Sequence, residues 1–382
     1  MNSNRLVFAS ACFGILIFGI SLVTLGSVAP SLQQEFALDK IASGALFSIL
    51  PVGILIGSIL FGPFADRFGY KIILILSGLI IFAGFQGIAY SGSLNILRMC
   101  VFLFGISGGA LNGAANALVS DISDRNKSAN LSLLGVFFAI GALGMPFVLG
   151  TLQTSFSFKQ IVSAIGTLPL AATLLFIITR FPEPKQKHGL PLGQVPLLLR
   201  NEFILLVGFF LFCQSSFEGI INNWTTTYLI QKLSIEESKA LYALSLYVLG
   251  MAVMRIFIGG VFRRASQDLI VKISFLLLLV GCLVLWLSNA HMIAVAGLIA
   301  IGAGLAAGFP VMLGFIGNKF AELSGTAFSI VLTIALLGNM IVNFLMGVIA
   351  EKFGIQHLPT MAFGLTVIMI TLFAILRKKS NL

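Results

Sequence analysis

The sequence predicts an all-helical integral membrane protein, with twelve transmembrane helices arranged as two pseudo-symmetric six-helix bundles. Hydrophobic residues make up 58% of the 382 positions and charged residues 9%, a balance that cannot cover a water-soluble surface. Apolar stretches of about 18 to 25 residues, each long enough to cross roughly 30 Å of hydrocarbon as a helix, occur twelve times. Glycines and small polar residues also recur at a fixed distance, which indicates an internal duplication.

The expected spans follow the apolar runs in chain order. They cover residues 6–29, 42–62, 71–90, 96–119, 131–152, 160–179, 203–229, 240–261, 270–288, 292–315, 325–347 and 358–376. The first run is retained as a membrane helix, because Arg5 leads into an apolar segment too long for a typical signal-peptide core and without a clear cleavage site.

One long polar connection divides the chain near its middle. Its four prolines and several cations are typical of a cytoplasmic linker rather than a folded segment. The predicted organisation is an N-terminal six-helix bundle at 1–179, a linker at 180–202 and a C-terminal six-helix bundle at 203–382. The other loops are too short to hold a separate activity, so the function is expected to reside within the helices.

The duplication is visible at an offset of 197 residues. The matching pairs are Gly62 and Gly259, Arg67 and Arg264, Gly105 and Gly302, Ser132 and Ser329, Gly141 and Gly338, and Gly150 and Gly347. Duplicated membrane units packed around a shared axis are the usual plan of secondary transporters, with a cavity between the halves near the bilayer midplane.

The formal net charge of +10 sorts by side of the membrane, so we do not expect a nucleic-acid partner. With the amino terminus inside, most Lys and Arg residues, among them Arg67, Lys71, Arg180 and Arg264, fall on the cytoplasmic side. The prediction is a multi-pass protein of a cell (inner or plasma) membrane with both termini in the cytoplasm. The expected partners are the lipid bilayer and a small-molecule substrate, and the chain is expected to be a monomer.

Cysteine and histidine give no sign of metal binding or catalysis. The cysteines lie in predicted helices without metal-type spacing, and the histidines lie in loops, where none can serve as an intramembrane proton relay. The residues concerned are Cys12, Cys100, Cys213, Cys282, His188, His291 and His357. We therefore expect no enzyme, no catalytic residues, no metal site and no cofactor apart from a coupling H⁺ or Na⁺.

The loop at residues 62–71 has the form G-x-x-x-D-R-x-G-x-K. With this motif, twelve spans and a two-bundle repeat, the chain resembles the major facilitator superfamily over its whole length. The resemblance implies a cytoplasmic gate formed by Gly62, Asp66, Arg67, Gly69 and Lys71, in which glycines allow close helix approach and Asp66 meets the start of a helix from the other bundle. A solvated interfacial turn remains the alternative for Arg67 and Lys71.

The seventh span carries an unusually polar face. Gln214, Glu218 and Asn222 are spaced by four, so they project from one side of the helix towards water, substrate or other polar groups. Glu218 is the one carboxylate deep in any predicted span, which makes it the candidate for binding a coupling proton or sodium ion. Arg255 is its candidate partner, and the alternative role for the two residues is a purely structural ion pair.

The pattern E-x5-W-x3-Y at Glu218, Trp224 and Tyr228 is similar to the fucose/glucose/galactose symporter branch of the superfamily. The segment at residues 111–116 resembles a family segment written L-E-x-A-A-N, but Asn112 stands where fucose-type members have a protonatable Glu. Either Glu218 then carries the proton coupling, or coupling is absent.

Amide side chains in the predicted helices supply donors and acceptors without charge, and a tryptophan ring adds a stacking plane, a mixture that suits a sugar. The candidate substrate-binding residues are Asn112, Asn116, Gln214, Asn222, Asn223, Trp224, Asn339 and Asn343. Hydrogen bonding between helices is the alternative role for any one of these asparagines.

These observations predict a secondary active transporter that works by alternating access, with proton- or sodium-coupled uptake of a small neutral sugar or polyol. The alternatives are an efflux antiporter of drugs or metabolites and, in another class, a membrane receptor or scaffold that transports nothing.

Overall fold

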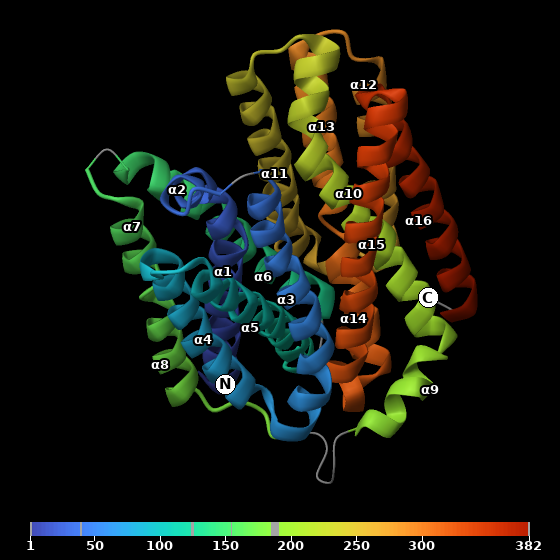
Figure 1. Ribbon diagram of the computed structural model, residues 1–382. Helices are drawn as coiled ribbons and strands as arrows, with labels where there is room; N and C mark the ends of the chain where they lie inside the picture. Colours follow the sequence, from blue (N-terminus) through green and yellow to red (C-terminus); the bar gives the residue numbers. More distant parts are fainter. Residues whose placement is uncertain (1, 39, 124–125, 154, 185–190, 381–382) are drawn as a thin grey trace. The chain divides into compact units, whose positions relative to one another are not determined.

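The computed structural model describes residues 2–38, 40–123, 126–153, 155–184 and 191–380, and the regular elements in these ranges are all helices (Figure 1). The first half holds α1 (Asn2–Ser27), α2 (Ala29–Glu35), α3 (Lys40–Phe68), α4 (Tyr70–Tyr90), α5 (Leu94–Asp121), α6 (Lys127–Leu152), α7 (Phe158–Ile165) and α8 (Leu168–Ile178). The second half holds α9 (Val195–Leu199), α10 (Glu202–Leu233), α11 (Glu237–Gly259), α12 (Gln267–Leu287), α13 (His291–Leu305), α14 (Gly308–Lys319), α15 (Ser324–Phe353) and α16 (Leu358–Ser380).

Twelve helical segments of the described chain are long and apolar enough to cross a membrane, which confirms the predicted fold class. Their order agrees with the twelve runs expected from the sequence. The end of the second span differs in an informative way. The second span continues through the charged motif to Phe68, and the turn follows at Gly69, whose φ of +79° favours glycine.

Two of the spans are broken helices. The sixth consists of α7 and α8, and the tenth of α13 and α14. A proline lies in the first turn of each following helix, Pro169 in α8 and Pro310 in α14. Proline lacks an N–H and fits the start of a helix, so both prolines favour a new start over an uninterrupted helix.

The chain divides into two compact units. Unit 1 comprises residues 1–124, 134–196 and 320–329, and unit 2 comprises 125–133, 197–319 and 330–382. Each unit therefore includes about ten residues from the opposite half of the sequence, namely the beginning of α15 in unit 1 and the beginning of α6 in unit 2. The sequence-based boundaries at 179 and 203 ignore these exchanged segments and stay a prediction, as does the linker, part of which (185–190) lies outside the described residues.

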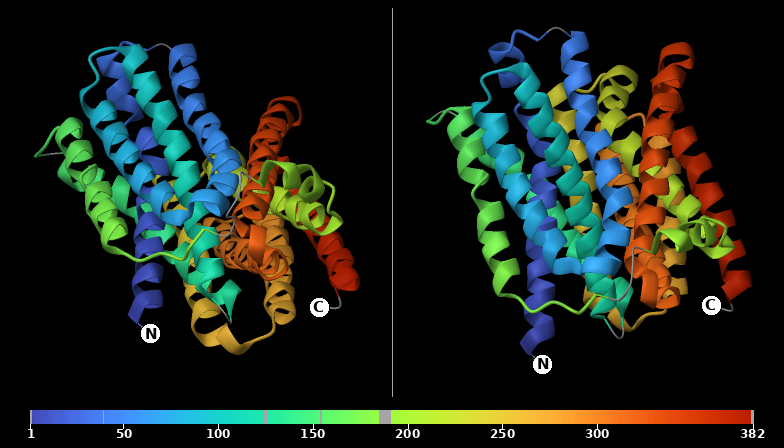
Figure 2. Two further views of the ribbon diagram at one scale, coloured as in Figure 1. Left: turned by 90° about the horizontal axis from the view of Figure 1, so that it is seen from below. Right: turned by 60° about the horizontal axis from the view of Figure 1, so that its bottom comes forward.

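Unit 1 is built around α5, which packs against α3, α4 and α1 (Figure 2). Glycines allow the closest of these contacts, since a Cβ on Gly109 would lie 2.2 Å from the Ile54 carbonyl oxygen. The helix α8 packs on α4 and α1 at the side of this group. Small residues at helix crossings are the usual means of bringing membrane helices together.

In unit 2, α13 packs against both α11 and α12, and α10 packs against α16 and α11. A Cβ on Gly302 would lie 2.0 Å from the Tyr247 carbonyl oxygen, so α13 and α11 approach as closely as helices in unit 1. Gly302 is the counterpart of Gly105 at the 197-residue offset, and Gly105 makes the same kind of contact, with Leu50, in unit 1.

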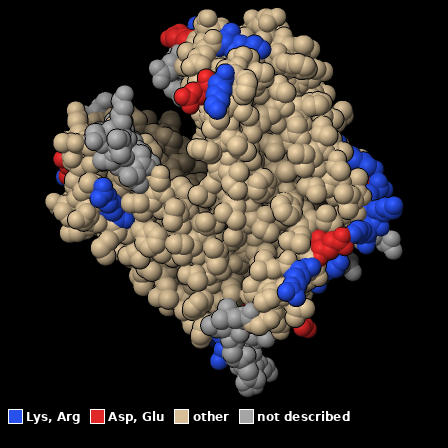
Figure 3. Space-filling view, turned by 45° about the vertical axis from the view of Figure 1, so that its right-hand side comes forward, with Lys and Arg blue, Asp and Glu red and all other residues tan. Residues whose placement is uncertain are grey.

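Large apolar side chains are exposed along the spans, including Phe147, Leu174, Leu276 and Phe344. Broad areas of the face in Figure 3 carry no Lys, Arg, Asp or Glu. An apolar exterior of this extent is expected of helices that face lipid.

Candidate functional site

The polar face of α10 begins with Gln214, whose side chain is fully buried in unit 2. Its amide nitrogen donates to Glu218 Oε1 at 2.9 Å and to the Leu305 carbonyl oxygen at 2.7 Å. Leu305 ends α13, where carbonyl groups lack intrahelical partners. Gln214 therefore joins the break in the tenth span to the carboxylate of Glu218.

Gly308, the first residue of α14, makes room for this amide. A Cβ at Gly308 would lie 2.2 Å from Gln214 Oε1, far inside any allowed contact. The Oε1 atom is buried and has no hydrogen-bond partner among the described residues. The opposite amide orientation is excluded, because it would set the Gln214 carbonyl oxygen against two other acceptors.

Glu218, Arg255 and Tyr247 form an electrostatically linked cluster between α10 and α11. Glu218 is half-buried, Arg255 is buried, and the Tyr247 hydroxyl is buried with no hydrogen-bond partner in the described part of the chain. The structure thus places the two sequence candidates within interaction range. Sequence reasoning missed Tyr247, because an aromatic residue in a membrane helix is usually interpreted as a packing or lipid-facing residue.

A second polar face of α10 meets α15. Asn223 donates to Asn343 Oδ1 at 3.0 Å, and Asn339 donates to the Ser215 carbonyl oxygen at 2.9 Å. Asn343 in turn donates to the backbone oxygen of Asn339 at 2.9 Å and to its side-chain oxygen at 3.0 Å. Gly219 lies under both amides, since its Cβ would meet the Asn343 nitrogen at 2.3 Å. The α10 and α15 candidates therefore lie together, in a cluster separate from Gln214.

The remaining α10 candidates are Trp224 and Asn222. The ring of the half-buried Trp224 lies near Gly347, whose Cβ would be 3.4 Å from its Cζ2 atom. The indole N–H is buried and has no partner among the described residues, and the side chain of Asn222 is exposed. An apolar ring with a buried N–H donor occurs in many sites for polar organic molecules.

Asn112 and Asn116 lie in α5, in unit 1, and are both half-buried. The Asn116 amide donates to the backbone and side-chain oxygens of Asn112 at 2.9 and 3.1 Å. Asn339 and Asn343 make the same backbone and side-chain bonds in unit 2, so each unit carries one self-bonded asparagine pair on a long helix.

The Asp66 carboxylate, at the end of α3, meets the start of α15 within unit 1. It accepts hydrogen bonds from the Gly325 N–H at 3.1 Å, the Thr326 N–H at 2.8 Å and the Thr326 hydroxyl at 2.6 Å. Asp66 is 1% exposed. A carboxylate held by the N–H groups of a helix start is favoured both by the hydrogen bonds and by the helix dipole.

The rest of the motif supports this contact. A Cβ on Gly62 would lie 2.5 Å from the Gly325 carbonyl oxygen, so α3 and the beginning of α15 touch at backbone distance. The Arg67 guanidinium lies 5.6 Å from the ring centroid of Phe68. Lys71 donates to the Ile177 carbonyl oxygen at 2.6 Å, at the end of α8.

Asp121 adds a contact that the sequence motif does not contain. It accepts hydrogen bonds from the Tyr70 hydroxyl and, at 2.7 Å, from the Ser324 hydroxyl. Asp121 ends α5, and Ser324 begins α15, so a second carboxylate meets the same helix start as Asp66. Only tertiary packing brings these residues together, and no local pattern signals the pairing.

No group of three or more His, Cys, Asp or Glu residues with metal-binding geometry occurs in the ranges that the structure describes. The polar clusters consist of amides, hydroxyls and the charged pair Glu218 and Arg255. Such groups can exchange hydrogen bonds with a polar solute.

The chain belongs to the major facilitator superfamily of transporters. The sequence profile described as Major Facilitator Superfamily matches residues 11–330 and 220–381, which together cover nearly the whole chain. Membership agrees with the twelve spans and the duplicated halves, and it is consistent with secondary transport. Curated relatives of the chain are transporters.

Two curated relatives and one solved structure illustrate the similarity. "Uncharacterized transporter y4wD" of Sinorhizobium fredii (strain NBRC 101917 / NGR234) is 24% identical over 340 residues, which are 88% of this chain and 89% of that protein. The 4-hydroxybenzoate transporter PcaK of Pseudomonas putida is 29% identical over 170 residues, 44% of this chain and 38% of PcaK. FucP, the E. coli fucose:proton symporter, was solved in an outward conformation and superposes with a TM-score of 0.83 at 18% identity, covering 99% of each chain.

Proposed function

We propose that this protein is a cation-coupled secondary transporter that takes up a small neutral sugar or polyol by alternating access. The observation that carries the proposal is the pair of polar faces on α10, one with Gln214 and Glu218 and the other with Asn223 meeting Asn339 and Asn343. Polar groups inside a span are costly unless they serve binding or coupling, so two adjacent polar faces on one helix favour a transport role.

Glu218 is the proposed coupling group. Its carboxylate interacts with the guanidinium of Arg255, and it lies half-buried on α10, where it accepts a hydrogen bond from Gln214. Binding of H⁺ or Na⁺ to Glu218 changes the charge balance with Arg255, which biases the conformational equilibrium of a two-state transporter. The alternative role of Glu218 is a permanent structural ion pair with Arg255. In that role Glu218 would bind no coupling ion.

The proposed substrate-binding residues are the amides of α5, α10 and α15 together with Trp224. A neutral polyol requires many hydrogen-bond donors and acceptors and an apolar stacking surface, and this set offers both. The self-bonded pairs, Asn116 with Asn112 and Asn343 with Asn339, retain free acceptor and donor positions for a ligand. FucP, which shares the fold, is named as a fucose:proton symporter.

An aromatic carboxylate is the second candidate substrate. The observation that favours it is the similarity to a 4-hydroxybenzoate transporter over 170 residues. A buried guanidinium such as that of Arg255 suits a carboxylate, and Trp224 suits an aromatic ring. In this case Arg255 would bind the substrate rather than stabilise Glu218.

The contacts of Asp66 with the start of α15 are the proposed cytoplasmic gate. Three donors converge on one buried carboxylate, and Gly62 allows the backbones to touch. In an alternating-access cycle these contacts form in one state and separate in the other. The proposed orientation places this gate, and both termini, on the cytoplasmic side of a cell membrane, with the protein acting as a monomer.

The test is transport by purified protein in proteoliposomes with an imposed proton or sodium gradient. Inward accumulation of a neutral sugar that collapses when the gradient is dissipated supports the proposal. Accumulation of 4-hydroxybenzoate instead supports the second candidate. Movement against the expected direction indicates an efflux antiporter, and absence of any flux across a panel of sugars, aromatic acids and cationic dyes indicates a receptor or scaffold.

The panel is chosen by a thermal-shift screen of the purified protein. A ligand that binds the native state raises the free energy of unfolding by mass action, by about 2.7 kcal/mol at a hundredfold excess over Kd, and the unfolding temperature rises with it. The screen covers the substrate classes of the competing functions: neutral sugars, nucleosides, amino acids, aromatic carboxylates and cationic dyes.

A further inference from the structure

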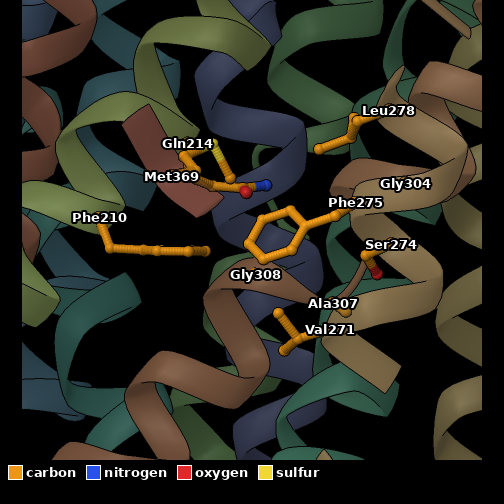
Figure 4. A pocket seen from close by; sticks show the side chains of 10 residues that line it. All are labelled: Phe210, Gln214, Val271, Ser274, Phe275, Leu278, Gly304, Ala307, Gly308 and Met369. Atoms are coloured by element: carbon orange, nitrogen blue, oxygen red, sulfur yellow. The ribbon is translucent and has the colours of Figure 1, made fainter. Parts of the chain in front are cut away.

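Apart from Glu218 and Arg255, the charged side chains that the structure describes in unit 2 lie near the ends of its helices. The interior holds a small cavity between α10, α12, α16 and the break between α13 and α14. Apolar side chains such as those of Phe275, Leu278 and Met369 form most of its wall, and none of the residues that line it is charged (Figure 4). A further charged ligand would therefore meet unit 2 at the helix ends.

The ends of three spans of unit 2 meet in a basic cluster. The last turn of α16 carries three consecutive cations at residues 377–379. Lys379 pairs with Glu202 at the start of α10. The Arg377 Nε atom lies 3.3 Å from Asp268 Oδ1, in the first turn of α12. These ion pairs hold the end of α16 against both neighbours, in agreement with the packing of α16 on α10 and α12.

The cluster contains more cations than acids. Asp268 is shared between Arg377 and Lys272, whose ammonium lies 2.6 Å from the second carboxylate oxygen. Arg200, two residues before the start of α10, and Lys378 are both exposed and have no ion pair among the described residues. Five cations against two carboxylates leave three positive charges in excess. The cluster therefore attracts an anion.

An exposed apolar surface continues from these charges along the same helices. On α12, Leu269 and Leu276 flank Lys272 at helical spacing, and the two leucines are 49% and 62% exposed. On α16, Ile368 and Ile375 lead towards the cations of the last turn at similar spacing, and they are exposed as well. On the face shown in Figure 3, basic side chains likewise border a broad area without charges. Positive charge above an apolar helix face matches a ligand with an anionic head and hydrocarbon chains.

We propose that the ends of α10, α12 and α16 form a binding site for an anionic phospholipid. The cations of the cluster hold its phosphate, and the acyl chains lie along the exposed apolar faces of α12 and α16. A zwitterionic phospholipid fits less well, because its own ammonium group offsets the phosphate charge. Neither the proposed substrate nor the coupling ion takes part, so the site stands independently of the proposed transport function.

Native mass spectrometry of the purified protein in detergent tests the proposal, by titration with phosphatidylglycerol or with phosphatidylcholine of the same chain length. We expect the wild-type protein to bind phosphatidylglycerol severalfold more tightly. The double variant Arg200→Gln and Lys378→Gln removes two exposed charges and breaks no ion pair that the structure describes. It should bind phosphatidylglycerol more weakly by roughly tenfold or more and leave phosphatidylcholine binding unchanged.

Arg5→Gln with Lys352→Gln is the matched control, because it removes one exposed arginine and one exposed lysine from helices outside the cluster, α1 and α15. The control should retain phosphatidylglycerol binding. Equal weakening in the two double variants would assign the preference to overall charge and overturn the proposal, as would equal binding of both lipids by the wild-type protein. Glycerophosphoglycerol, the same headgroup without acyl chains, should bind far more weakly than the lipid. Binding as tight as that of phosphatidylglycerol would indicate a site for a soluble phosphate ester and refute the lipid assignment.

Discussion

At the scale of single residues, what distinguishes the polar side chains of the spans is whether their hydrogen bonds are complete. Asp66 has three donors on one carboxylate, whereas the hydroxyl of Tyr247 is buried with no partner among the described residues. A satisfied polar group holds its surroundings in place. An unsatisfied one costs free energy and is retained where a ligand, a proton or another state of the protein completes it.

Asp66→Asn should destabilise the protein by about 2 kcal/mol, because hydrogen bonds to a charged acceptor at a helix start are replaced by an amide whose NH₂ group faces other donors. The unfolding temperature is measured with a thiol-reactive dye, since Cys12, Cys213 and Cys282 are buried until the protein unfolds. Asp268→Asn is the control. Asp268 pairs at the surface with Lys272 and Arg377, and the same substitution there should have a small effect. Equal losses in the two variants would contradict a special role of the Asp66 contact.

Tyr247→Phe and Tyr228→Phe form a matched pair, because both rings are fully buried and only Tyr228 has a bonded hydroxyl, which donates to the Leu285 carbonyl oxygen at 3.0 Å. Tyr228→Phe should cost about 1 kcal/mol of unfolding free energy, and Tyr247→Phe should cost nothing or stabilise. If Tyr247 assists coupling, its variant should nevertheless change gradient-driven uptake. A stable Tyr247→Phe protein with unaltered uptake would assign this residue to packing alone.

At the scale of helices, the break between α13 and α14 connects the tenth span to the seventh. The Gln214 amide crosses to the Leu305 carbonyl group, and Gly308 leaves the space for it. Discontinuous membrane helices commonly lie at the sites of transporters, because their free backbone groups bind ions, substrates or polar side chains. Here one such group, the Leu305 carbonyl oxygen, accepts a hydrogen bond from a glutamine that also donates to Glu218.

Gly308→Ala should disrupt this connection. The new methyl group would lie 2.2 Å from Gln214 Oε1, so the amide must leave either Leu305 or Glu218. We expect a loss of about 1 to 3 kcal/mol in unfolding free energy, which corresponds to one buried polar group left unsatisfied. Gly364→Ala in α16 is the control, because nothing lies within 4 Å of its Cβ, and alanine there should be neutral or mildly stabilising. A Gly308→Ala protein as stable as Gly364→Ala would show that Gln214 moves freely.

The spans could be predicted from the sequence, because hydropathy over about 20 residues responds directly to membrane thickness. The breaks in the sixth and tenth spans were not predicted, since both halves of each broken span are apolar and the hydropathy does not change at Gly166 or Ala306. Pro169 and Pro310 were the available signals, but proline is tolerated within membrane helices and does not by itself fix a break.

The candidate site was predictable in part for a related reason. The spacing of four places Gln214 and Glu218 on one face whatever the tertiary structure. The partners of that face come from α11 and α14, and periodicity along α10 carries no information about them. Tyr247 and Gly308 were therefore missed, and Asp121 was missed because only tertiary packing brings it to Ser324 at the start of α15. The roles assigned from sequence to the substrate, coupling and gate residues stay predictions.

At the scale of the whole molecule, the duplication extends from sequence to individual hydrogen bonds. Ser329 donates to the Ser58 carbonyl oxygen at 2.6 Å in unit 1, and Ser132 donates to the Arg255 carbonyl oxygen at 3.0 Å in unit 2. The two acceptor residues, Ser58 and Arg255, are 197 positions apart, and so are the two serines. The same holds for the glycines beside them, because Gly62 meets Thr326 and Gly259 meets Ala129.

The two copies differ in charge at the equivalent positions 66 and 263. Asp66 bonds to the start of α15, whereas its counterpart, Arg263, donates to the Asn130 side chain in α6 at 3.1 Å. The position thus contacts the equivalent helix in both units, but with opposite charge. A carboxylate is favoured at a helix start by the dipole and a guanidinium is not, so the two contacts are expected to differ in strength.

Ser329→Ala and Ser132→Ala should each cost about 1 kcal/mol of unfolding free energy, because equivalent hydroxyl groups lose equivalent backbone bonds. Ser120→Ala is the control. Ser120 is also fully buried, but its hydroxyl has no partner in the described part of the chain, so its loss should be neutral or stabilising. The thiol-dye assay measures all three variants. If Ser120→Ala cost as much as the other two, the destabilisation would reflect lost packing and not the duplicated bonds.

Glu218→Gln addresses how the whole transporter uses a gradient. The substitution keeps the size of the side chain and a hydrogen-bond acceptor for Gln214, but it removes the charge that interacts with Arg255. A variant with a permanently neutral group should still exchange substrate across the membrane with equal concentrations on both sides, because binding and conformational change remain possible. It should lose accumulation against a concentration gradient, since the side chain can no longer gain or release a cation.

Exchange and accumulation are measured in the same proteoliposomes. Glu351 is an exposed acid at the end of α15, and Glu351→Gln is the control that should retain both activities. Accumulation that survives in Glu218→Gln would exclude Glu218 as the coupling group and leave it as the structural partner of Arg255. Loss of both accumulation and exchange would indicate that Glu218 takes part in substrate binding.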